Sequence, residues 1–383
     1  MTTFSIEFPN SDLGVIPAYQ IHGFSFTTRL TAMYAVSKVI FRDFSKTAFN
    51  LLKVGMDVNV IFSETDDTSV KYINPMKVKS FTKSPAANDS VVDTMILELI
   101  SAWYYVADVQ TAHYFGSVGA ITYQVLNNSF KDLGYKFDIT TTTDWPKSRY
   151  QISKRPQAFL EWLIPRGLKD NYPLYFYTDH KGVIRLVGYN DFAINQNFYL
   201  AQVMGMENIQ EASARDYAIS ILNLTAYDVI LNPTYSAAQS IHTVNHYHSA
   251  TAYPQDTLLL SCESNGLASD AKKNIQVAEN SPVKIEISPW YECPHDARAE
   301  FLSENWRQMS QTFKVIATLP EFQLEDCSLG NLIRLELPFN AVQNPTTGET
   351  LNFAEGGYLI DSLTFTWEKG KRSTVFEMFQ IRF

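Results

Sequence analysis

Cysteine is scarce in this sequence. Its three cysteines, Cys262, Cys293 and Cys327, stand far apart along the 383 residues. No pair has the close spacing of a metal knuckle, and an odd number of thiols does not make a disulfide framework. We therefore expect buried free thiols.

Positive charge is also in deficit, with 31 Lys and Arg against 40 Asp and Glu and a formal net charge of −9. Because phosphate backbones are bound by concentrated Lys and Arg, this balance argues against tight nucleic-acid binding. Long apolar runs are missing as well, so we expect no membrane span. The start, MTTFSIEFPNSD, has neither the cationic region nor the apolar core of a signal peptide, and we expect the protein to be made and kept in a cytoplasm.

Aromatic residues are abundant by contrast: 25 Phe, 21 Tyr and 6 Trp make up 14% of the chain. Rings pack well on pleated sheet faces and at interfaces, so this share favours a β-rich protein with large contact surfaces. The length of the chain favours two or three domains.

The first third reads as strands. Val58, Val60 and Phe62 share one face of a predicted strand, and Asp57, Asn59 and Ile61 share the other. Further strands are predicted within Gln20–Phe41, Met76–Lys83 and Val91–Trp103, the last two joined as a hairpin. We interpret residues 1–105 as a first antiparallel β-barrel.

The middle third mixes helices and strands. Ser117–Gly134 has a Ser at the N-cap position, apolar residues at helical spacing and a closing Gly, and Arg155–Gly167 begins a second helix at Pro156. Pro173–Tyr189 places two strand-like runs around the turn Asp179–Gly182. Residues 106–200 are therefore predicted to be an α+β insertion.

The last third returns to β patterns, which predict a second β-barrel over residues 201–383. One helix, Asp296–Phe313, is expected to pack on it through a stripe of Trp306, Met309 and Phe313. Strands are predicted at Tyr227–Pro233, Asp256–Cys262, Val283–Tyr291 and the C-terminus. The predicted fold class is thus mostly β, with two similar antiparallel β-barrel domains and a middle α+β domain.

An internal repeat links the two β regions. The segment VGMDVNVIF (Val54–Phe62) aligns without a gap with LGNLIRLEL (Leu329–Leu337), and KVKSFT (Lys77–Thr82) aligns downstream with LIDSLT (Leu359–Thr364). A Gly before each strand suits a tight turn or a bulge. Chance likeness between two antiparallel sheets is the alternative, but the equal order of elements favours duplication.

Candidate chemistry is sparse. Three imidazoles, His242, His246 and His248, lie within seven residues, yet they do not form the HExxH pattern and have no Cys or carboxylate at a recognised spacing. They are the one weak metal candidate, and a polar loop or interface is the preferred interpretation. The acidic residues Glu98, Asp138, Asp144 and Glu161 fall on different predicted elements, so nothing pairs them for glycoside hydrolysis.

Two further segments are only partial matches to known motifs. GKRST (Gly370–Thr374) lacks the earlier glycine of a phosphate loop and is predicted to be a hairpin turn, and Ser117 in FGSVG is predicted to be a helix cap and not a nucleophile. We predict no catalytic residues, no cofactor and no enzymatic activity.

Two stretches resemble the central hub proteins of contractile phage baseplates, of which the T-even phage hub is the best-known member. They are PLYFYTDHKGVIRLVGYNDFAINQ (Pro173–Gln196) and GNLIRLELPF with GGYLIDSLTFTWEKGKRSTVFEMFQI (Gly330–Ile381). The resemblance implies a homotrimeric ring in which paired barrels present six similar units to a six-fold tail tube, while a three-fold spike docks below. It implies a virion protein of the tail baseplate, assembled in the host cytoplasm.

The expected partners are the tail tube or a tube-initiator protein, the central spike protein and other baseplate proteins. The spike is expected as a separate chain, because this chain ends at Phe383 in a predicted strand. An acidic lining is expected to keep the central channel from holding DNA. The alternatives are a metal-dependent or lytic hydrolase of the tail and a hub-like module of another contractile injection machine.

Overall fold

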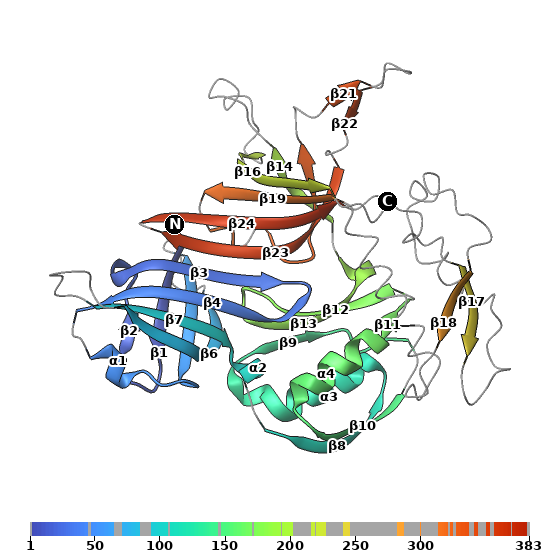
Figure 1. Ribbon diagram of the computed structural model, residues 1–383, viewed down its shortest axis with the longest axis horizontal. Helices are drawn as coiled ribbons and strands as arrows, with labels where there is room; N and C mark the ends of the chain where they lie inside the picture. Colours follow the sequence, from blue (N-terminus) through green and yellow to red (C-terminus); the bar gives the residue numbers. More distant parts are fainter. Residues whose placement is uncertain are drawn as a thin grey trace.

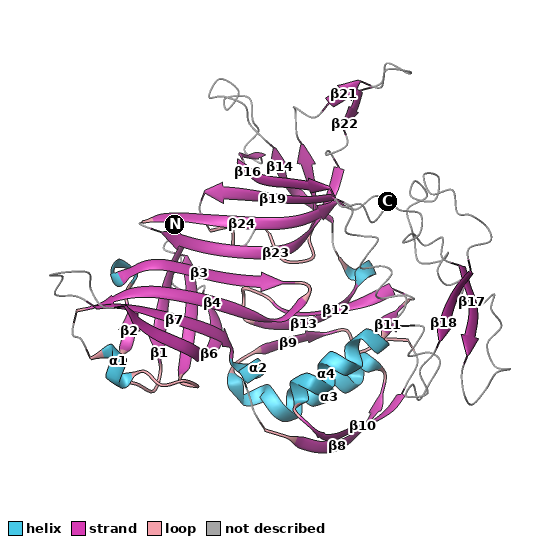
Figure 2. Cartoon of the chain, in the orientation of Figure 1, coloured by secondary structure: helices cyan, strands magenta, loops and turns pink. Residues whose placement is uncertain are grey.

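The computed structural model is dominated by strands, with two longer helices gathered at one side (Figures 1 and 2). It describes residues 2–44, 47–64, 71–84, 93–105, 108–144, 147–170, 172–192, 194–201, 216–218, 220–226, 240–245, 282–286, 299, 313–320, 322–324, 327–336, 341–343, 350–352, 356–368 and 370–380. No helix in the described part of the chain has both the length and the apolar character needed to cross a membrane.

The N-terminal β unit is an antiparallel sheet with the strand order β3-β4-β7-β6-β5-β1-β2. Its strands are β1 (Thr2–Phe8), β2 (Gly14–Ile16), β3 (Ile21–Arg29), β4 (Ala32–Asp43), β5 (Asp57–Glu64), β6 (Lys71–Ser84) and β7 (Asp93–Ser101), with the short helices η1 (Ala18–Gln20) and α1 (Ala48–Leu51). The predicted alternation is confirmed: Val58, Val60 and Phe62 are all fully buried. The predicted hairpin is confirmed as well, because β6 pairs antiparallel with β7.

The insertion holds α3 and α4 between two small sheets (Figure 1). One sheet has the order β11-β12-β13-β9 and the other pairs β10 with β8. Its elements are α2 (Ala102–Tyr105), β8 (Gln110–Gly116), α3 (Val118–Phe130), η2 (Lys131–Leu133), β9 (Lys136–Ile139), β10 (Lys147–Lys154), α4 (Pro156–Leu163), η3 (Ile164–Arg166), β11 (Leu168–Lys169), β12 (Tyr172–Thr178), β13 (Val183–Gly188) and η4 (Tyr189–Asp191).

Local sequence signals explain both helices of the insertion. The Ser117 hydroxyl accepts a hydrogen bond from the amide of Ala120 at the start of α3, and Gly134 ends that region in the left-handed conformation. Pro156 is the first residue of α4, where its missing N–H costs nothing. A separate core forms around the fully buried Trp103, against which Phe130 and Phe176 pack edge-on.

The C-terminal β unit contains two strand branches that meet at β23. Its strands are β14 (Ile194–Ala201), β15 (Asp216–Ala218), β16 (Ser220–Ala226), β19 (Phe313–Pro320), β20 (Leu332–Glu336), β23 (Gly356–Glu368) and β24 (Lys371–Gln380). Two separate strand pairs are β17 (Ser240–Asn245) with β18 (Pro282–Glu286) and β21 (Ala341–Gln343) with β22 (Thr350–Asn352). The predicted turn at Gly370 is confirmed, because Glu368 faces Lys371 across the β23–β24 hairpin.

The predicted helix Asp296–Phe313 is wrong at its end, because Phe313 is the first residue of β19 and pairs with Ala226. Ala299 is helical, and the rest of this prediction, including Trp306 and Met309, lies outside the described residues. The predicted strands Tyr227–Pro233 and Asp256–Cys262 lie outside them too, while β18 covers the start of the predicted strand Val283–Tyr291.

The two β units join into one sheet of 14 strands, because β3 pairs along its outer edge with β23 (Figure 1). A single hydrophobic core runs beneath the junction and includes residues of both units, such as Phe26 and Phe365. The fold is therefore mostly β with an α+β insertion, as predicted. The domain limits at residues 105 and 200 stay predictions, and β14 spans the second of them.

Candidate functional site

The repeated glycines form matching corners in the two β units. In the N-terminal unit, the Gly55 amide donates to the Val78 carbonyl oxygen at 2.7 Å, and the Val78 amide donates to the Met56 carbonyl oxygen at 3.0 Å. Gly55 has φ +85°, a left-handed conformation that favours glycine. The corner therefore fixes where β5 enters its pairing with β6.

The C-terminal unit repeats this pattern. The Gly330 amide donates to the Ile360 carbonyl oxygen at 3.0 Å, and the Ile360 amide donates to the Asn331 carbonyl oxygen at 3.1 Å. Gly330 has φ +78°. Ile360 occupies the place of Val78, as the alignment of the two segments predicts.

A β-bulge follows each corner at the same place. The register between β6 and β7 shifts between Val78 and Ser80, and the register between β23 and β24 shifts between Ile360 and Ser362. A bulge bends its strand and strengthens the local twist, so both units curve at the same point. The run β3-β4-β7-β6-β5 corresponds to β16-β19-β24-β23-β20, and the predicted duplication is confirmed over these strands.

The junction between the units is a strand pairing with side-chain contacts on both faces. Ser362 to Glu368 of β23 run antiparallel to Arg29 to Gly23 of β3. The hydroxyl oxygens of Thr27 and Thr364 are 3.0 Å apart, and Trp367 Nε1 donates to the Ile21 carbonyl oxygen at 3.3 Å.

Aromatic rings fill the core beneath this junction. Phe365 packs against Phe62 and Phe322 with ring centroids 5.4 and 5.7 Å apart, and Phe4 stacks on Phe24 at 4.2 Å. Since Phe322 and Phe365 come from the C-terminal unit and the others from the N-terminal unit, the two sheets share one buried aromatic cluster. This packing holds the units as one body.

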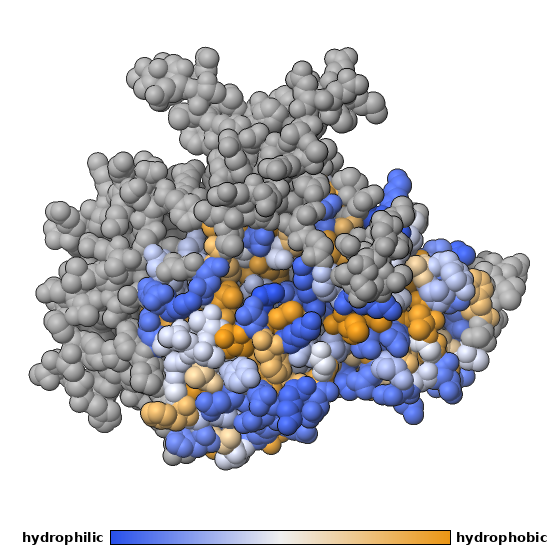
Figure 3. Space-filling model, turned by 180° about the vertical axis from the view of Figure 1, so that it is seen from behind, coloured by the Kyte–Doolittle hydropathy of each residue, from blue (hydrophilic) through white to orange (hydrophobic). Residues whose placement is uncertain are grey.

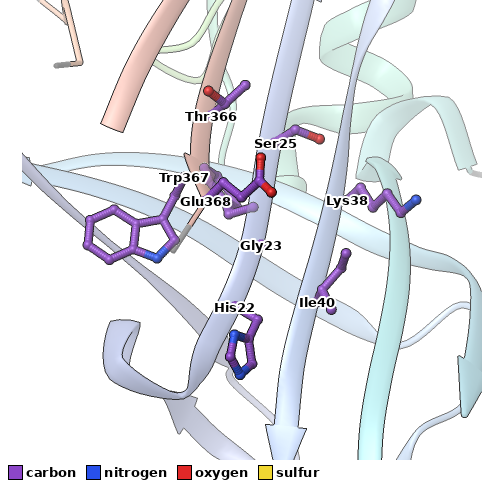
Figure 4. Close-up of a pocket in the computed structure, with 9 residues that line it drawn as sticks. His22, Gly23, Ser25, Lys38, Ile40, Thr366, Trp367 and Glu368 are labelled. Carbon is purple, nitrogen blue, oxygen red and sulfur yellow. The ribbon is translucent and has the colours of Figure 1, made fainter. Parts of the chain in front are cut away.

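A hollow of about 410 Å³ lies over the junction. It is lined by His22, Gly23, Phe24 and Ser25 of β3, Lys38 and Ile40 of β4, and Thr366, Trp367 and Glu368 of β23 (Figure 4). The lining combines an indole and an isoleucine with one imidazole, one ammonium and one carboxylate. The lining therefore offers both apolar and charged groups to whatever binds there.

The hairpin turn of the insertion reaches both β units. The His180 carbonyl oxygen accepts from Asn74 Nδ2 of the N-terminal unit at 2.8 Å, and its Nε2 lies 2.8 Å from the Leu324 carbonyl oxygen of the C-terminal unit. The ring packs 5.2 Å from Phe365. At Gly182, an added Cβ would lie 2.2 Å from the Ile73 carbonyl oxygen, so the turn sits directly against β6.

Burial sets the charge state of this turn. Complete burial lowers the pKa of His180, although the carboxylate of Asp179 opposes the shift. Asp179, 2% exposed, accepts hydrogen bonds from the amides of Lys181 and Val183 and from Arg185 Nε. Burial likewise raises the pKa of Tyr177, whose hydroxyl donates to the Leu329 carbonyl oxygen.

The sequence matches no family model and no curated protein, but solved structures share its fold. The 43 kDa tail protein of prophage MuSo2 from Shewanella oneidensis is 12% identical over 99% of this chain and 98% of that chain, with a TM-score of 0.59. The tail protein from Neisseria meningitidis MC58 is 6% identical over 99% and 96%, with a TM-score of 0.61. The chain has the fold of these tail proteins. The predicted resemblance to phage tail proteins is thus confirmed at the level of the fold.

A third similar structure comes from a Francisella PdpA-VgrG complex. It is 10% identical over 99% of this chain, with a TM-score of 0.50. The match covers 52% of that longer chain. The shared fold therefore occurs there as part of a larger protein.

The structure leaves the histidine cluster as a prediction. His242 lies in β17, and His246 and His248 lie outside the described residues. Where residues are described, no three His, Cys, Asp or Glu side chains are grouped as metal ligands. Of the three cysteines, Cys327 is fully buried and its thiol donates to the Gln323 carbonyl oxygen at 3.5 Å, and the other two lie outside the described part.

The four acidic candidates have separate partners. Glu98 accepts from Ser80 Oγ, Asp138 pairs with Arg185, and Asp144 accepts from the amide of Asp170. Glu161 accepts from the Tyr104 hydroxyl at 2.8 Å, and burial together with this carboxylate raises the pKa of Tyr104 to about 12. None of these contacts joins two of the four carboxylates, so the geometry does not assemble a glycosidase pair from them.

Sequence reasoning missed the junction of β3 with β23 and the buried turn at His180. The turn Asp179–Gly182 is polar, which is typical of a solvent-exposed hairpin loop. The predicted strand Met76–Lys83 begins too late to include Asn74, which lies in β6 and is 2% exposed.

Proposed function

We propose that this protein is a structural component of a contractile phage tail and acts there as the homotrimeric baseplate hub. The observation that carries the proposal is the presence of two equivalent β units, with matching glycine corners and bulges, in a chain that has a phage tail-protein fold over its full length. Three such chains in a ring would present six similar units on one face while keeping three-fold symmetry elsewhere.

The insertion supports a difference between the two ends of such a ring. It interrupts the repeat, and its helices and small sheets pack at one side of the joined units (Figure 1). In this proposal the β units contact a six-fold tail tube or tube-initiator protein, and the insertion lies toward a three-fold central spike and other baseplate proteins. The protein would then reside in the virion after assembly in the host cytoplasm.

The proposed interfaces are protein surfaces of mixed character. Seen from behind, hydrophobic residues lie in several patches separated by hydrophilic ones on the described face (Figure 3). Interfaces that form after folding of the separate chains are commonly of this composition. The net charge of −9 also favours protein partners over nucleic acid.

Size and symmetry test the proposal together. Light scattering of the purified chain should give three times the 43.5 kDa of one chain, and electron microscopy should show a three-fold ring with six similar lobes. A monomer at high concentration, or a ring with true six-fold symmetry, would exclude the homotrimeric hub. Absence of the chain from purified tail particles would exclude the virion role.

A hub-like module of another contractile injection machine is the second candidate, because the fold also matches the Francisella PdpA-VgrG complex. Both candidates have the same chain architecture, so the particle that contains the protein distinguishes them. Mass spectrometry of particles that carry DNA-filled heads should detect the chain if it belongs to a phage. Its presence only in headless contractile particles would favour the second candidate.

A further inference from the structure

The C-terminal part of β6 is an open sheet edge. Ser80 to Ser84 pair with β7 on one side, and no other strand in the described part of the chain pairs with them. Thr82, Lys83 and Ser84 are exposed. An unpaired edge offers its backbone amides and carbonyls to another strand.

The equivalent edge of the C-terminal β unit is covered. Ser362 to Thr366 of β23 stand where Ser80 to Ser84 stand in β6, because each run follows the matching bulge. This edge of β23 pairs with β3, and Phe365 is fully buried there. The open edge of β6 therefore has the backbone geometry of an edge that is known within this chain to accept a strand.

An exposed phenylalanine marks the same difference. Phe44 directly follows β4, and Phe322 stands two residues beyond the end of β19, the strand equivalent to β4. By the strand registers of β4 with β7 and of β19 with β24, Phe322 takes the position of Phe44. Phe322 is 4% exposed and packs on Phe62, whereas Phe44 is 56% exposed.

The strand that could cover this edge is β16. In the N-terminal unit, β3 pairs with β4 on one side and with β23 on the other. In the C-terminal unit, β16 takes the place of β3 and pairs with β19, and its second edge pairs with no strand among those described. Among the described strands, the end of β6 is thus an open acceptor edge and β16 an open donor edge, and the two edges are different.

We propose that the end of β6 in one protomer pairs antiparallel with β16 of the next copy of this chain, and so continues the sheet from protomer to protomer. This inference rests on the proposed trimer and names the surface that closes it. Because the two edges differ, the contact is head-to-tail and not a two-fold dimer, and the proposed trimer requires that it close after three copies. Phe44 would be covered in the ring as Phe322 is covered within the chain.

The registers predict which residues meet. In the N-terminal unit, Glu98 of β7 faces Lys38 of β4, and Lys38 faces Ser25 of β3. In the C-terminal unit, Glu377 of β24 faces Ile316 of β19, and Ile316 faces Asn223 of β16. Asn223 of β16 therefore takes the register position of Ser25 of β3. Thr225, two positions beyond Asn223, therefore takes the register position of Thr27. Thr27 faces Thr364 across the junction within the chain, and Thr82 occupies the position of Thr364 in β6. Thr82 is thus predicted to face Thr225 of the next copy.

Lys83 fits an edge that must stay soluble before assembly. It stands at the position of Phe365, forms an ion pair with Asp93 at 2.8 Å and lies over the ring of Phe49. A charged residue on an exposed edge strand limits uncontrolled pairing. When the backbone edge is paired, the ammonium group keeps the carboxylate of Asp93 as its charge partner.

A disulfide between the predicted neighbours tests the pairing. Facing residues of antiparallel strands have Cα atoms about 4.5–5.5 Å apart, within the range that a disulfide spans. The double variant T82C/T225C, kept with the three native cysteines, should form covalent trimers under oxidation, seen on non-reducing gels and lost on reduction. Either single variant should give no more cross-linking than the wild type, and T27C/T364C should form a bond within one chain.

The outcomes separate this inference from the proposed function. A trimer in solution that gives no covalent trimer from T82C/T225C, or cross-links only to a tube or spike protein, overturns the strand pairing and leaves the hub proposal standing. A wild-type protein that forms no trimer overturns both.

A second variant keeps the strand pairing testable if the double cysteine variant does not fold. F44S changes a side chain that is exposed in the separate chain, so its fold should be retained. Burial of a phenylalanine contributes on the order of 1.5–3 kcal/mol, so trimer dissociation should increase about tenfold or more. The control F115S changes a phenylalanine of β8 that is 69% exposed, and it should leave the trimer unchanged. Equal effects of both variants would overturn the assignment of Phe44 to the interface.

Discussion

Asn74 holds the carbonyl group of His180 across the boundary between the N-terminal β unit and the insertion, with Nδ2 donating at 2.8 Å. Both residues are buried, and the ring of His180 continues to the C-terminal unit, where Nε2 contacts the Leu324 carbonyl oxygen. The turn is therefore the place where all three parts of the chain meet. The stability of this turn should therefore show whether the three parts of the chain are packed together.

The first prediction concerns pH. Burial lowers the pKa of His180 below its ordinary value of about 6.5, and its Nδ1 has no hydrogen-bond partner among the described residues. The unfolded chain therefore binds a proton below pH 6.5 that the folded chain excludes, so this contribution to stability is present above that pH and is lost as the pH falls. The loss is at most about 1.4 kcal/mol per pH unit.

Urea unfolding at pH 7.5 and pH 5.5 measures this effect. The wild type should lose more unfolding free energy between the two pH values than H180Q, whose amide can still donate to the Leu324 carbonyl oxygen but does not titrate. The comparison uses the pH dependence and not the absolute stability, since the substitution itself carries a cost. An equal loss in both proteins would show that His180 is not the titrating group.

The second prediction concerns the glycine corners. A Cβ at Gly330 would lie 2.5 Å from the ring of Phe192, whereas one at Gly55 would lie 3.3 Å from the ring of Tyr105. Both residues have positive φ, which costs an alanine about 1–2 kcal/mol. G330A should therefore lower the unfolding free energy by clearly more than G55A, as measured by urea denaturation.

Gly370 supplies the matched control for this series. It has φ +85°, like Gly55, and an added Cβ would meet no atom within 4 Å. G370A should therefore show the conformational cost alone. If G330A lowered the unfolding free energy no more than G370A does, the close approach of the Phe192 ring would not restrict which residue fits at this corner.

The third prediction compares two carboxylates that share one arginine. Asp179 is 2% exposed and satisfies two backbone amides besides Arg185, while the side chain of Asp138 is 59% exposed. D179A should cost about 2–4 kcal/mol of unfolding free energy, because it leaves buried donors without an acceptor. D138A should cost less than about 1 kcal/mol, since exposed ion pairs contribute little. Chemical denaturation of both variants at neutral pH measures the two losses of unfolding free energy. Equal losses would show that the two carboxylates contribute equally to stability.

Much of the local structure was predictable because it depends on neighbours in sequence. The alternation at Val58, Val60 and Phe62 predicts a half-buried strand, and Ser117 predicts the start of a helix. The equivalence of Gly55 and Gly330 was also visible, since tight corners with positive φ restrict the residue type.

The rest depends on contacts between distant segments, which leave no period in the sequence. The strand pairing of Thr27 with Thr364 joins residues from opposite ends of the chain. The sequence of either strand is equally compatible with a different neighbouring strand. The burial of His180 was hidden for the same reason, because a polar turn looks solvent-exposed until the segments that cover it are known. The end of the helix at Phe313 was misjudged because an aromatic residue continues an apolar helix stripe as readily as it begins a strand.

The last prediction uses Phe322 and Phe44, which hold equivalent positions in different surroundings. Phe322 is 4% exposed within the aromatic cluster, so F322A should lower the unfolding free energy by about 3–5 kcal/mol at every protein concentration. Phe44 is 56% exposed in the separate chain, so F44A should cost less than about 1 kcal/mol in dilute protein. At concentrations where the wild type is trimeric, however, F44A should have a lower unfolding free energy than the wild type, because association stabilises a chain that buries a ring there more than one that does not. Urea titrations at two protein concentrations a hundredfold apart separate the two cases, and an F44A deficit that does not change with concentration would place Phe44 outside any interface between copies.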